Sequence, residues 1–452
     1  MARYPKIETL SNNAVDIINA VKNSAGQDYK NYVPYVTPDS DSLKAMGAVV
    51  MDRPSLLNEF IDTLSNVIGM RVVTSKMYEN PWAFMKKGIL DYGETVEENF
   101  VTLIKPHEYD PYVAQNELFK NEVPDVRTAF HIRNYQKFYK VTINYDLLRD
   151  AFASWGAMGS FIDYIFAQMY TSANYDEYIV MKYMLQRVLC DGLMTPYDKP
   201  INNTNTMAKT MRAMSDNFTL MSPNYNLAHV HNFTLKNDQF LFMDTFMLAE
   251  MDVDELAVAF NMDKVNFMGH VVAIDGFDKT DNDRLNELLS PAEWYRPLNA
   301  GDLETLANVS AVLVGRDWFQ IYDNLIRRTN IENPDALSYN YDLHVWKTFS
   351  FSPFENAVVF SSVAPAVTSV TVNPATATLD KGASLQLSAT VATTGFAPKS
   401  VTWESNNPNA VSVSPRGMVK VSSTAESETQ VTITATSTFD SSKKNTCTIT
   451  VA

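Results

Sequence analysis

Three histidines in the second half of the chain have the residue type that a metal site requires. His229 and His231 are two residues apart, so on a strand both would face the same side, and His270 follows further along. A zinc site needs a third or fourth ligand, and the sequence places no cysteine or other ligand near the pair. We therefore expect ordinary surface or core histidines here and no metal site.

An acidic stretch, DGFDKTDNDRLNE at residues 275–287, has the carboxylate density of a calcium loop. An EF-hand that starts at Asp278 would place Asp283 at the sixth position, where the loop requires glycine, so the pattern favours a solvated loop. The GxSxG, Walker A, Rossmann glycine and HExxH patterns are also missing from the sequence. We expect no catalytic, cofactor or metal residues, and a protein that is not an enzyme.

A second set of residues suits contact with another protein chain. Residues 70–105 have strand-like ends, MRVVTSKM and FVTLIK, around a middle that is broken by Asn80-Pro81, Gly88 and Gly93, which predicts a long hairpin with an elaborate tip. The tip combines large rings with both signs of charge, in Trp82, Phe84, Lys86, Lys87, Asp91 and Glu94. Rings at a loop tip need a partner, so we expect these six residues to form an intermolecular contact. The alternative is that Trp82 folds back onto its own subunit.

The composition describes a globular protein of several domains. The chain has 452 residues, of which 46% are hydrophobic, and this length favours two or three domains. Its formal net charge of −15 lies almost entirely before residue 367, which argues against a dedicated nucleic-acid binder. Two cysteines, far apart in the sequence, exclude a disulfide framework. The N-terminal segment has a proline and a glutamate where a signal peptide needs its apolar core, so we expect a protein that is made and folded in a cytoplasm.

Helices and strands follow one another in a recognisable order. Helical spacing appears at residues 11–24 and 52–69, on either side of an extended arm at 32–42. Residues 157–192, with no glycine or proline between Gly159 and Gly192, predict a long helix. Over 208–335 strand patterns in QFLFMDTFMLAEM, HVVAIDGF, VSAVLVG and DWFQIYDN alternate with a helix pattern in DVDELAVAFNMD. Residues 339–363 are strongly β.

The last 86 residues have a different composition. Residues 367–452 are rich in Thr, Ser and Val and predict seven short alternating strands, which is typical of an immunoglobulin-like sandwich. A short linker at 361–369 precedes them. We expect a separable module that the fold of the preceding body does not require.

An N-terminal arm, a long two-stranded loop, a spine helix, an α+β lobe and a returning sheet occur together in one architecture. Their order resembles the Hong Kong 97 (Johnson) fold of the major capsid proteins of tailed phages. Several segments are also similar to phi-29-like podophage capsid proteins, which end in a group-two bacterial immunoglobulin-like domain: NPWAFMKKG, YDEYIVMK, DVDELAVAFNM, VVAIDGF, DWFQIYDNL and YDLHVWKT.

The resemblance implies an α+β fold with named parts. These are an N-terminal arm with helices (1–69), an E-loop hairpin (70–105), a P-domain (106–207) with its spine helix at 157–192, an A-domain (208–335), returning P-domain strands (336–364) and the immunoglobulin-like domain (367–452). It also implies a major capsid protein that self-assembles into an icosahedral or prolate head around double-stranded DNA.

The implied partners are other copies in pentamers and hexamers, a scaffolding protein, a portal at one vertex, head fibres or decoration proteins, and packaged DNA bound without sequence specificity. No cofactor and no membrane are implied. The implied location is the virion, after assembly in the host cytoplasm.

Two other protein classes carry similar terminal modules. A cell-surface or surface-layer adhesin would need a secretion signal, for which the sequence offers no candidate. A glycan-processing enzyme would need paired carboxylates in a cleft, and such a pair cannot be located from sequence.

Overall fold

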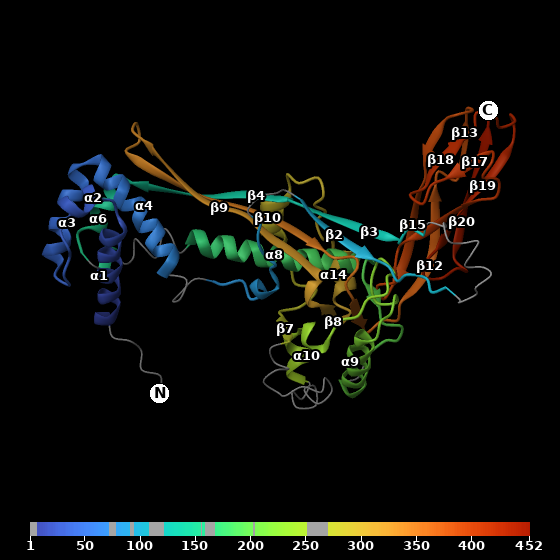
Figure 1. The fold of residues 1–452 in the computed structure, drawn as a ribbon, viewed down its shortest axis with the longest axis horizontal. Coiled ribbons are helices and arrows are strands. Elements are labelled where there is room, and N and C mark those ends of the chain that lie inside the picture. The colour runs from blue at the N-terminus through green and yellow to red at the C-terminus, as the bar shows by residue number, and fades with distance from the viewer. Residues whose placement is uncertain are drawn as a thin grey trace. The chain divides into compact units, whose positions relative to one another are not determined.

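The computed structural model describes residues 7–71, 78–90, 95–107, 122–154, 156–158, 168–201, 204–250 and 270–452. They divide into two compact units. Unit 1 comprises Met1–Thr95, Ile132–Val180 and Ile321–Phe349, and unit 2 comprises Val96–His131, Met181–Gln320 and Ser350–Ala452. Figure 1 shows the elements of both units along the chain. None of the helices in the described residues is long and apolar enough to cross a membrane.

Unit 1 begins with packed helices. They are α1 (Ile7–Ser24), α2 (Gln27–Tyr32), α3 (Ser40–Asp52), α4 (Pro54–Arg71) and, later in the chain, α6 (Tyr145–Ala151). The predicted helices at 11–24 and 52–69 are confirmed as α1 and α4. The extended arm is shorter than predicted, because Asp39 caps α3 with its side chain and the helix then buries Leu43, Met46 and Val50.

Unit 1 also contains most of a four-stranded sheet in the order β1-β9-β10-β4. Its strands are β1 (Gly88–Ile89), β9 (Phe319–Asn333), β10 (Ser338–Phe351) and β4 (Tyr135–Asn144), and the first two residues of β9 and the last two of β10 belong to unit 2. β10 and β4 are antiparallel from Ser338↔Asn144 to Lys347↔Tyr135, and β1 runs parallel to β9.

The predicted long helix is confirmed as α8 (Gln168–Cys190), about 35 Å long at 1.5 Å per residue. Residues 159–167 of the prediction lie outside the described residues. α8 ends where Gly192, with φ +67, adopts the left-handed conformation typical of a residue that follows a helix.

Unit 2 has a five-stranded sheet in the order β5-β11-β8-β6-β7. These strands are β5 (Thr195–Pro196), β11 (Ala357–Ser361), β8 (Val309–Gly315), β6 (Gln239–Asp244) and β7 (Val271–Ile274). The helices are α9 (Thr204–Thr219), α10 (Thr245–Glu250), α13 (Asn282–Leu289) and α14 (Ala300–Leu306), with single 3₁₀ turns at Lys236–Asp238 and Arg316–Trp318. Met207, Met211 and Phe218 form the buried stripe of α9, in one core with β6, β8 and β11.

The sequence prediction for this lobe holds for most of its elements. The strands predicted in HVVAIDGF and VSAVLVG are β7 and β8, and the one in DWFQIYDN begins β9. QFLFMDTFMLAEM is only half strand, because the chain turns into α10 at Thr245. The helix predicted in DVDELAVAFNMD lies outside the described residues.

The hairpin predicted at 70–105 is wrong in its described parts, and residues 72–77 of its first strand lie outside the described residues. Met70 and Arg71 belong to α4, and the C-terminal strand, β2 (Thr95–Val101), pairs instead with β3 (Val126–Ile132) in a separate two-stranded sheet. We call β2, β3 and the described residues that follow or precede them, 102–107 and 122–125, the ribbon. The expected tip, residues 78–90, is a 3₁₀ turn (Ala83–Met85) followed by β1, and it lies in unit 1.

The C-terminal residues form an all-β sandwich, drawn in orange and red in Figure 1. It has nine strands: β12 (Ala366–Asn373), β13 (Thr376–Leu379), β14 (Ser384–Gln386), β15 (Ser388–Thr394), β16 (Val401–Ser405), β17 (Val411–Val413), β18 (Met418–Val421), β19 (Gln430–Ser437) and β20 (Lys444–Val451). Two more are present than predicted. TATL forms β13, and SLQLSATV changes sheets at buried Leu387, where β14 pairs with β18 and β15 with β12.

Candidate assembly surfaces

The 78–90 segment is built into its own subunit. Trp82 is 0% exposed, and its ring meets the ring of Tyr178 on α8 edge to face at 5.4 Å. Asn80 starts the turn by accepting a hydrogen bond from the Trp82 N–H with its side chain. The exposed position that we expected for Trp82 is therefore wrong, because α8 supplies the apolar partner that its ring requires.

Four buried or half-buried charged side chains connect the same segment to α8, β9 and β10. Glu177 of α8 is 3% exposed, and its Oε2 accepts from Lys86 Nζ at 3.1 Å and from Lys347 Nζ of β10. Asp323 of β9 accepts from the same two lysine nitrogens, at 2.6 Å from Lys86 and 2.8 Å from Lys347. Asn80 donates to the second Glu177 oxygen at 2.6 Å. We call these five side chains the charge cluster.

The hydrogen bonds of the charge cluster depend on all of its members. Burial, and then the neighbouring Lys86 ammonium, lower the pKa of Lys347 to about 6, so that its nitrogen donates to both carboxylates with or without the extra proton. Each carboxylate in turn has two lysine nitrogens within reach. Since removal of one partner would leave the others buried and unsatisfied, the cluster fixes the 78–90 segment to α8, β9 and β10.

The other predicted contact residues have different positions. Lys86, expected to meet acids of another subunit, pairs with Glu177 and Asp323 of its own. Phe84 is 46% exposed, in contrast to buried Trp82, and Lys87 is half-buried. Asp91 and Glu94 lie outside the described residues.

One face of the ribbon, which belongs to unit 2 except for Thr95 and Ile132, packs against other residues of that unit. On this face Phe100 stacks on Phe354 at 5.6 Å, and buried His131 lies 3.0 Å from Glu98 and 2.8 Å from Ser350. Ser352 also donates to Glu98 at 2.7 Å. These contacts set the alternation of the two strands, so that every second side chain faces away from Phe354, Ser350 and Ser352.

The opposite face of the ribbon exposes large apolar side chains among polar ones. Phe130 is 63% exposed near the end of β3, and Val126 at the start of β3 and Val101 at the end of β2 are also exposed. Thr128, between Val126 and Phe130, donates to Asn99 of β2 at 2.6 Å. The described residues beyond the strands add Leu103, Ile104 at 78% and Val123 at 87%. An isolated two-stranded ribbon is at best marginally stable in water, and exposed apolar side chains gathered on one ribbon mark a contact surface. Sequence reasoning missed this surface, although the FVTLIK run was its signal.

The groups that could do other chemistry are dispersed. Among the described residues, no three His, Cys, Asp or Glu side chains are grouped so that they could hold a metal ion. His229 and His231 are exposed, and His270 lies against the Gln239 carbonyl at 3.0 Å. Of the acidic stretch, Asp281 caps α13 by accepting from the Arg284 N–H, and Asp275 pairs with Lys182.

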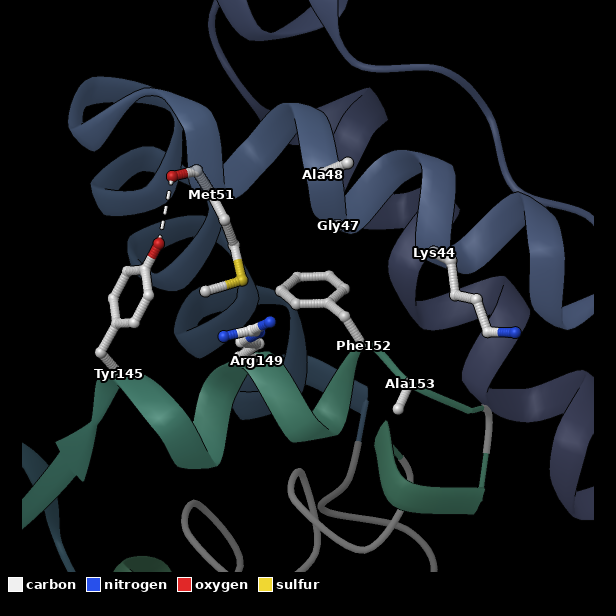
Figure 2. Close-up of a pocket in the computed structure, with 8 residues that line it drawn as sticks. All are labelled: Lys44, Gly47, Ala48, Met51, Tyr145, Arg149, Phe152 and Ala153. Carbon is white, nitrogen blue, oxygen red and sulfur yellow. Dashed lines mark hydrogen bonds between the residues drawn. The ribbon is translucent and has the colours of Figure 1, made fainter.

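A pocket of about 400 Å³ opens between α3 and α6 in unit 1 (Figure 2). Its lining consists of Lys44, Gly47, Ala48, Met51, Tyr145, Arg149, Phe152 and Ala153. Figure 2 shows Arg149 and Phe152 directed from α6 and its C-terminal end toward α3, where Tyr145 donates to the Met51 carbonyl at 3.4 Å. No carboxylate lines this pocket, so it lacks the paired acids that glycoside hydrolysis requires.

The sequence matches two known families along its length. Residues 18–361 match the family described as Phi29-like phage major capsid protein, and residues 366–449 match the group 2 bacterial Ig-like domain. The major capsid protein of Bacillus phage PZA is 36% identical over 430 residues, which cover 93% of this chain and 89% of that protein. The major capsid protein of Bacillus phage B103 is 37% identical over 431 residues, with the same two coverages of 93% and 89%.

A solved structure has the same fold at low sequence identity. The capsid structure of Staphylococcus phage Andhra contains a chain that superimposes with a TM-score of 0.52 at 14% identity, covering 64% of this chain and 86% of that one. At this identity the likeness establishes a shared fold.

Proposed function

The chain belongs to the family of Phi29-like phage major capsid proteins, and on that basis we propose that its copies close into the head shell of a tailed phage by covering the apolar faces of one another's ribbons. The fold is the Hong Kong 97 capsid fold with a C-terminal immunoglobulin-like domain. Because the capsid family accounts for residues 18–361, the adhesin alternative, which rested on the terminal module, has no further support.

The observation that carries the proposal is the exposed apolar face of the ribbon. Covering one side chain such as Phe130 or Ile104 contributes roughly 1.5–3 kcal/mol, and every subunit of a closed shell repeats the contact. In this fold we assign the E-loop to residues 95–132 in place of 70–105. The anchored face gives the ribbon a fixed direction, and the free face gives it affinity for a second copy.

The 78–90 segment has a smaller part in this scheme. Phe84, with its exposed ring, is the member of the predicted set that we assign to a neighbouring subunit. Trp82 and Lys86 act within the subunit, where they position the turn that presents Phe84. The other domain boundaries given in the sequence analysis, including the A-domain at 208–335, stay proposals.

The shell has further proposed partners. Pentamers and hexamers of this chain would assemble on a scaffolding protein in the host cytoplasm, with a portal at one vertex and head fibres outside. The net charge of −15 suits a wall that encloses double-stranded DNA without binding its sequence, because a tight electrostatic grip needs a basic surface. The proposed role is structural, without catalysis.

Electron microscopy of the purified chain, alone and after co-expression with a scaffolding protein, tests the proposal. We expect capsomers or open fragments from the chain alone and closed shells of uniform size from the pair. Monomers under both conditions, at concentrations where scaffolding protein is in excess, would contradict it.

A further inference from the structure

The loop that joins β15 to β16 contacts the C-terminal end of α8, and both lie in unit 2. Lys399 Nζ donates to the carbonyl oxygen of Cys190, the last residue of α8, at 2.6 Å. The last carbonyls of a helix have no partner within the helix, and a cation there is also favoured by the helix dipole. A side chain of the sandwich therefore completes the end of a helix in the body.

The body has a recess that fits this loop. Gly192 follows α8 with φ +67, and a Cβ there would lie 2.9 Å from the Ala397 carbonyl oxygen and 3.2 Å from the backbone nitrogen of Lys399. Any larger residue would push the loop away, quite apart from its backbone strain. The close approach of two backbones thus depends on a glycine whose conformation also ends the helix.

The loop itself adopts a conformation that needs outside support. Phe396 has φ +66, in the left-handed region that a bulky residue rarely occupies. Its side chain is buried, yet it is not one of the residues that form the described core of the sandwich. Together with Leu189, Cys190 and Thr305 of the body, it lines a small cavity of about 60 Å³. Strained backbone of this kind persists where surrounding contacts fix it.

We propose that residues 393–399 are a docking plug that locks the sandwich to the C-terminal end of α8. The plug couples the sandwich mechanically to the helix. A force that a partner applies to the sandwich is therefore transmitted to α8 as well as to the connection at residues 362–365. The aromatic ring of Phe396 and the ammonium group of Lys399 supply the lock, and Gly192 makes room for it. This inference goes beyond shell assembly and does not depend on it.

The two cysteines of the chain report separately on docking and folding. Cys190 lies beneath the plug, where burial, and then the Asp302 carboxylate, raise the pKa of its thiol to about 12. Cys447 is buried in the sandwich core and does not line the cavity beneath the plug. Because only an exposed thiolate reacts with a thiol reagent, labelling of Cys190 measures undocking and labelling of Cys447 measures unfolding of the sandwich.

The experiment compares labelling rates in the full chain with the reagent DTNB under native conditions. For a Phe396→Ala/Lys399→Met variant we expect Cys190 to label at least ten times faster than in the wild type, with Cys447 unchanged. Lys420→Met, on an exposed position of β18 in the same sandwich, is the matched control and should label as the wild type does.

Equal Cys190 rates in the wild type and the double variant would overturn the proposal, and so would a wild-type Cys190 that reacts like a free thiol. If Cys447 is also labelled in the double variant, the sandwich of that variant has unfolded. The single Lys399→Met variant then tests the proposal, because the Lys399 side chain is outside the sandwich core. Faster Cys190 labelling in that variant supports the lock, and an unchanged rate overturns it.

Discussion

Glu177→Gln is expected to release the 78–90 segment from the sheet and from α8. In the wild type the Glu177 carboxylate accepts from Asn80, Lys86 and Lys347, all in or beside the buried interior of unit 1. A glutamine has one acceptor oxygen, and its amide would face lysine donors. Breaking a buried ion pair by removal of one partner costs about 3–5 kcal/mol.

Hydrogen exchange of the full chain measures this loss locally. The amide hydrogens of Lys87 and Leu90 bond to the carbonyls of Ile321 and Asp323, so they exchange only when the segment opens. We expect their exchange to accelerate by roughly 10²- to 10³-fold, at one factor of ten per 1.4 kcal/mol.

Glu79→Gln is the matched control, because it makes the same chemical change two residues from the turn at an exposed carboxylate. It should leave the exchange of both amides unchanged. The structural account of the charge cluster would be wrong if Glu177→Gln left the exchange as slow as in the wild type, or if the two variants behaved alike.

Phe130→Asp is expected to prevent shell formation while the subunit stays folded. Phe130 lies on the outward face of the ribbon, so its replacement disturbs none of the contacts that Phe100 and His131 make with unit 2. A charge in place of the ring forfeits roughly 1.5–3 kcal/mol at each contact and adds a buried carboxylate if the neighbour still binds. Since the contact repeats over the shell, the concentration needed for assembly should rise beyond the wild-type range.

Sedimentation of the scaffold-assisted assembly gives the readout, together with the thermal unfolding midpoint of the free subunit. Phe130→Leu keeps an apolar side chain at the same position and should still form shells. An exposed substitution of this kind should change subunit stability by no more than about 0.5 kcal/mol. Normal shells from Phe130→Asp, or equal failure of Phe130→Leu, would show that the outward face of the ribbon is not an assembly contact.

Local patterns in the sequence predicted most elements of the fold. α1, α4 and α8 have apolar stripes at helical spacing, and the sandwich strands alternate over three to eight residues, so neighbouring residues alone carry enough information. The resemblance to capsid proteins added the order of the parts. The number of strands in the sandwich was underestimated at Leu387, where a sequence pattern does not distinguish one bent strand from two.

The position of the 78–90 segment could not be predicted in this way. Its partners are Glu177, Asp323 and Lys347, which lie far away in the sequence and come from three different elements. Without them, Asn80-Pro81 and Gly88 indicate only a turn. A signal was nevertheless present in α8, where Asp176 and Glu177 interrupt an apolar pattern in the middle of a helix: buried acids of this kind need cationic or hydrogen-bonding partners.

In the ribbon, the pairing of the two strands could not be predicted from the sequence. The strand predicted in FVTLIK overlaps β2 only at Phe100 and Val101, and its partner β3 follows after a long connection, so the pairing depended on tertiary structure. Once the pairing is known, Val101, Val126 and Phe130 are seen to share a face that the described residues of unit 2 leave exposed.

A reconstruction of the assembled shell by electron cryo-microscopy, at a resolution that shows side chains, tests the central claim most directly. The account predicts that Phe130 and Val101 of every ribbon are covered by a second copy of the chain, while Phe100 remains stacked on Phe354 of its own subunit. A closed shell in which the outward face of the ribbon lies in solvent would contradict it.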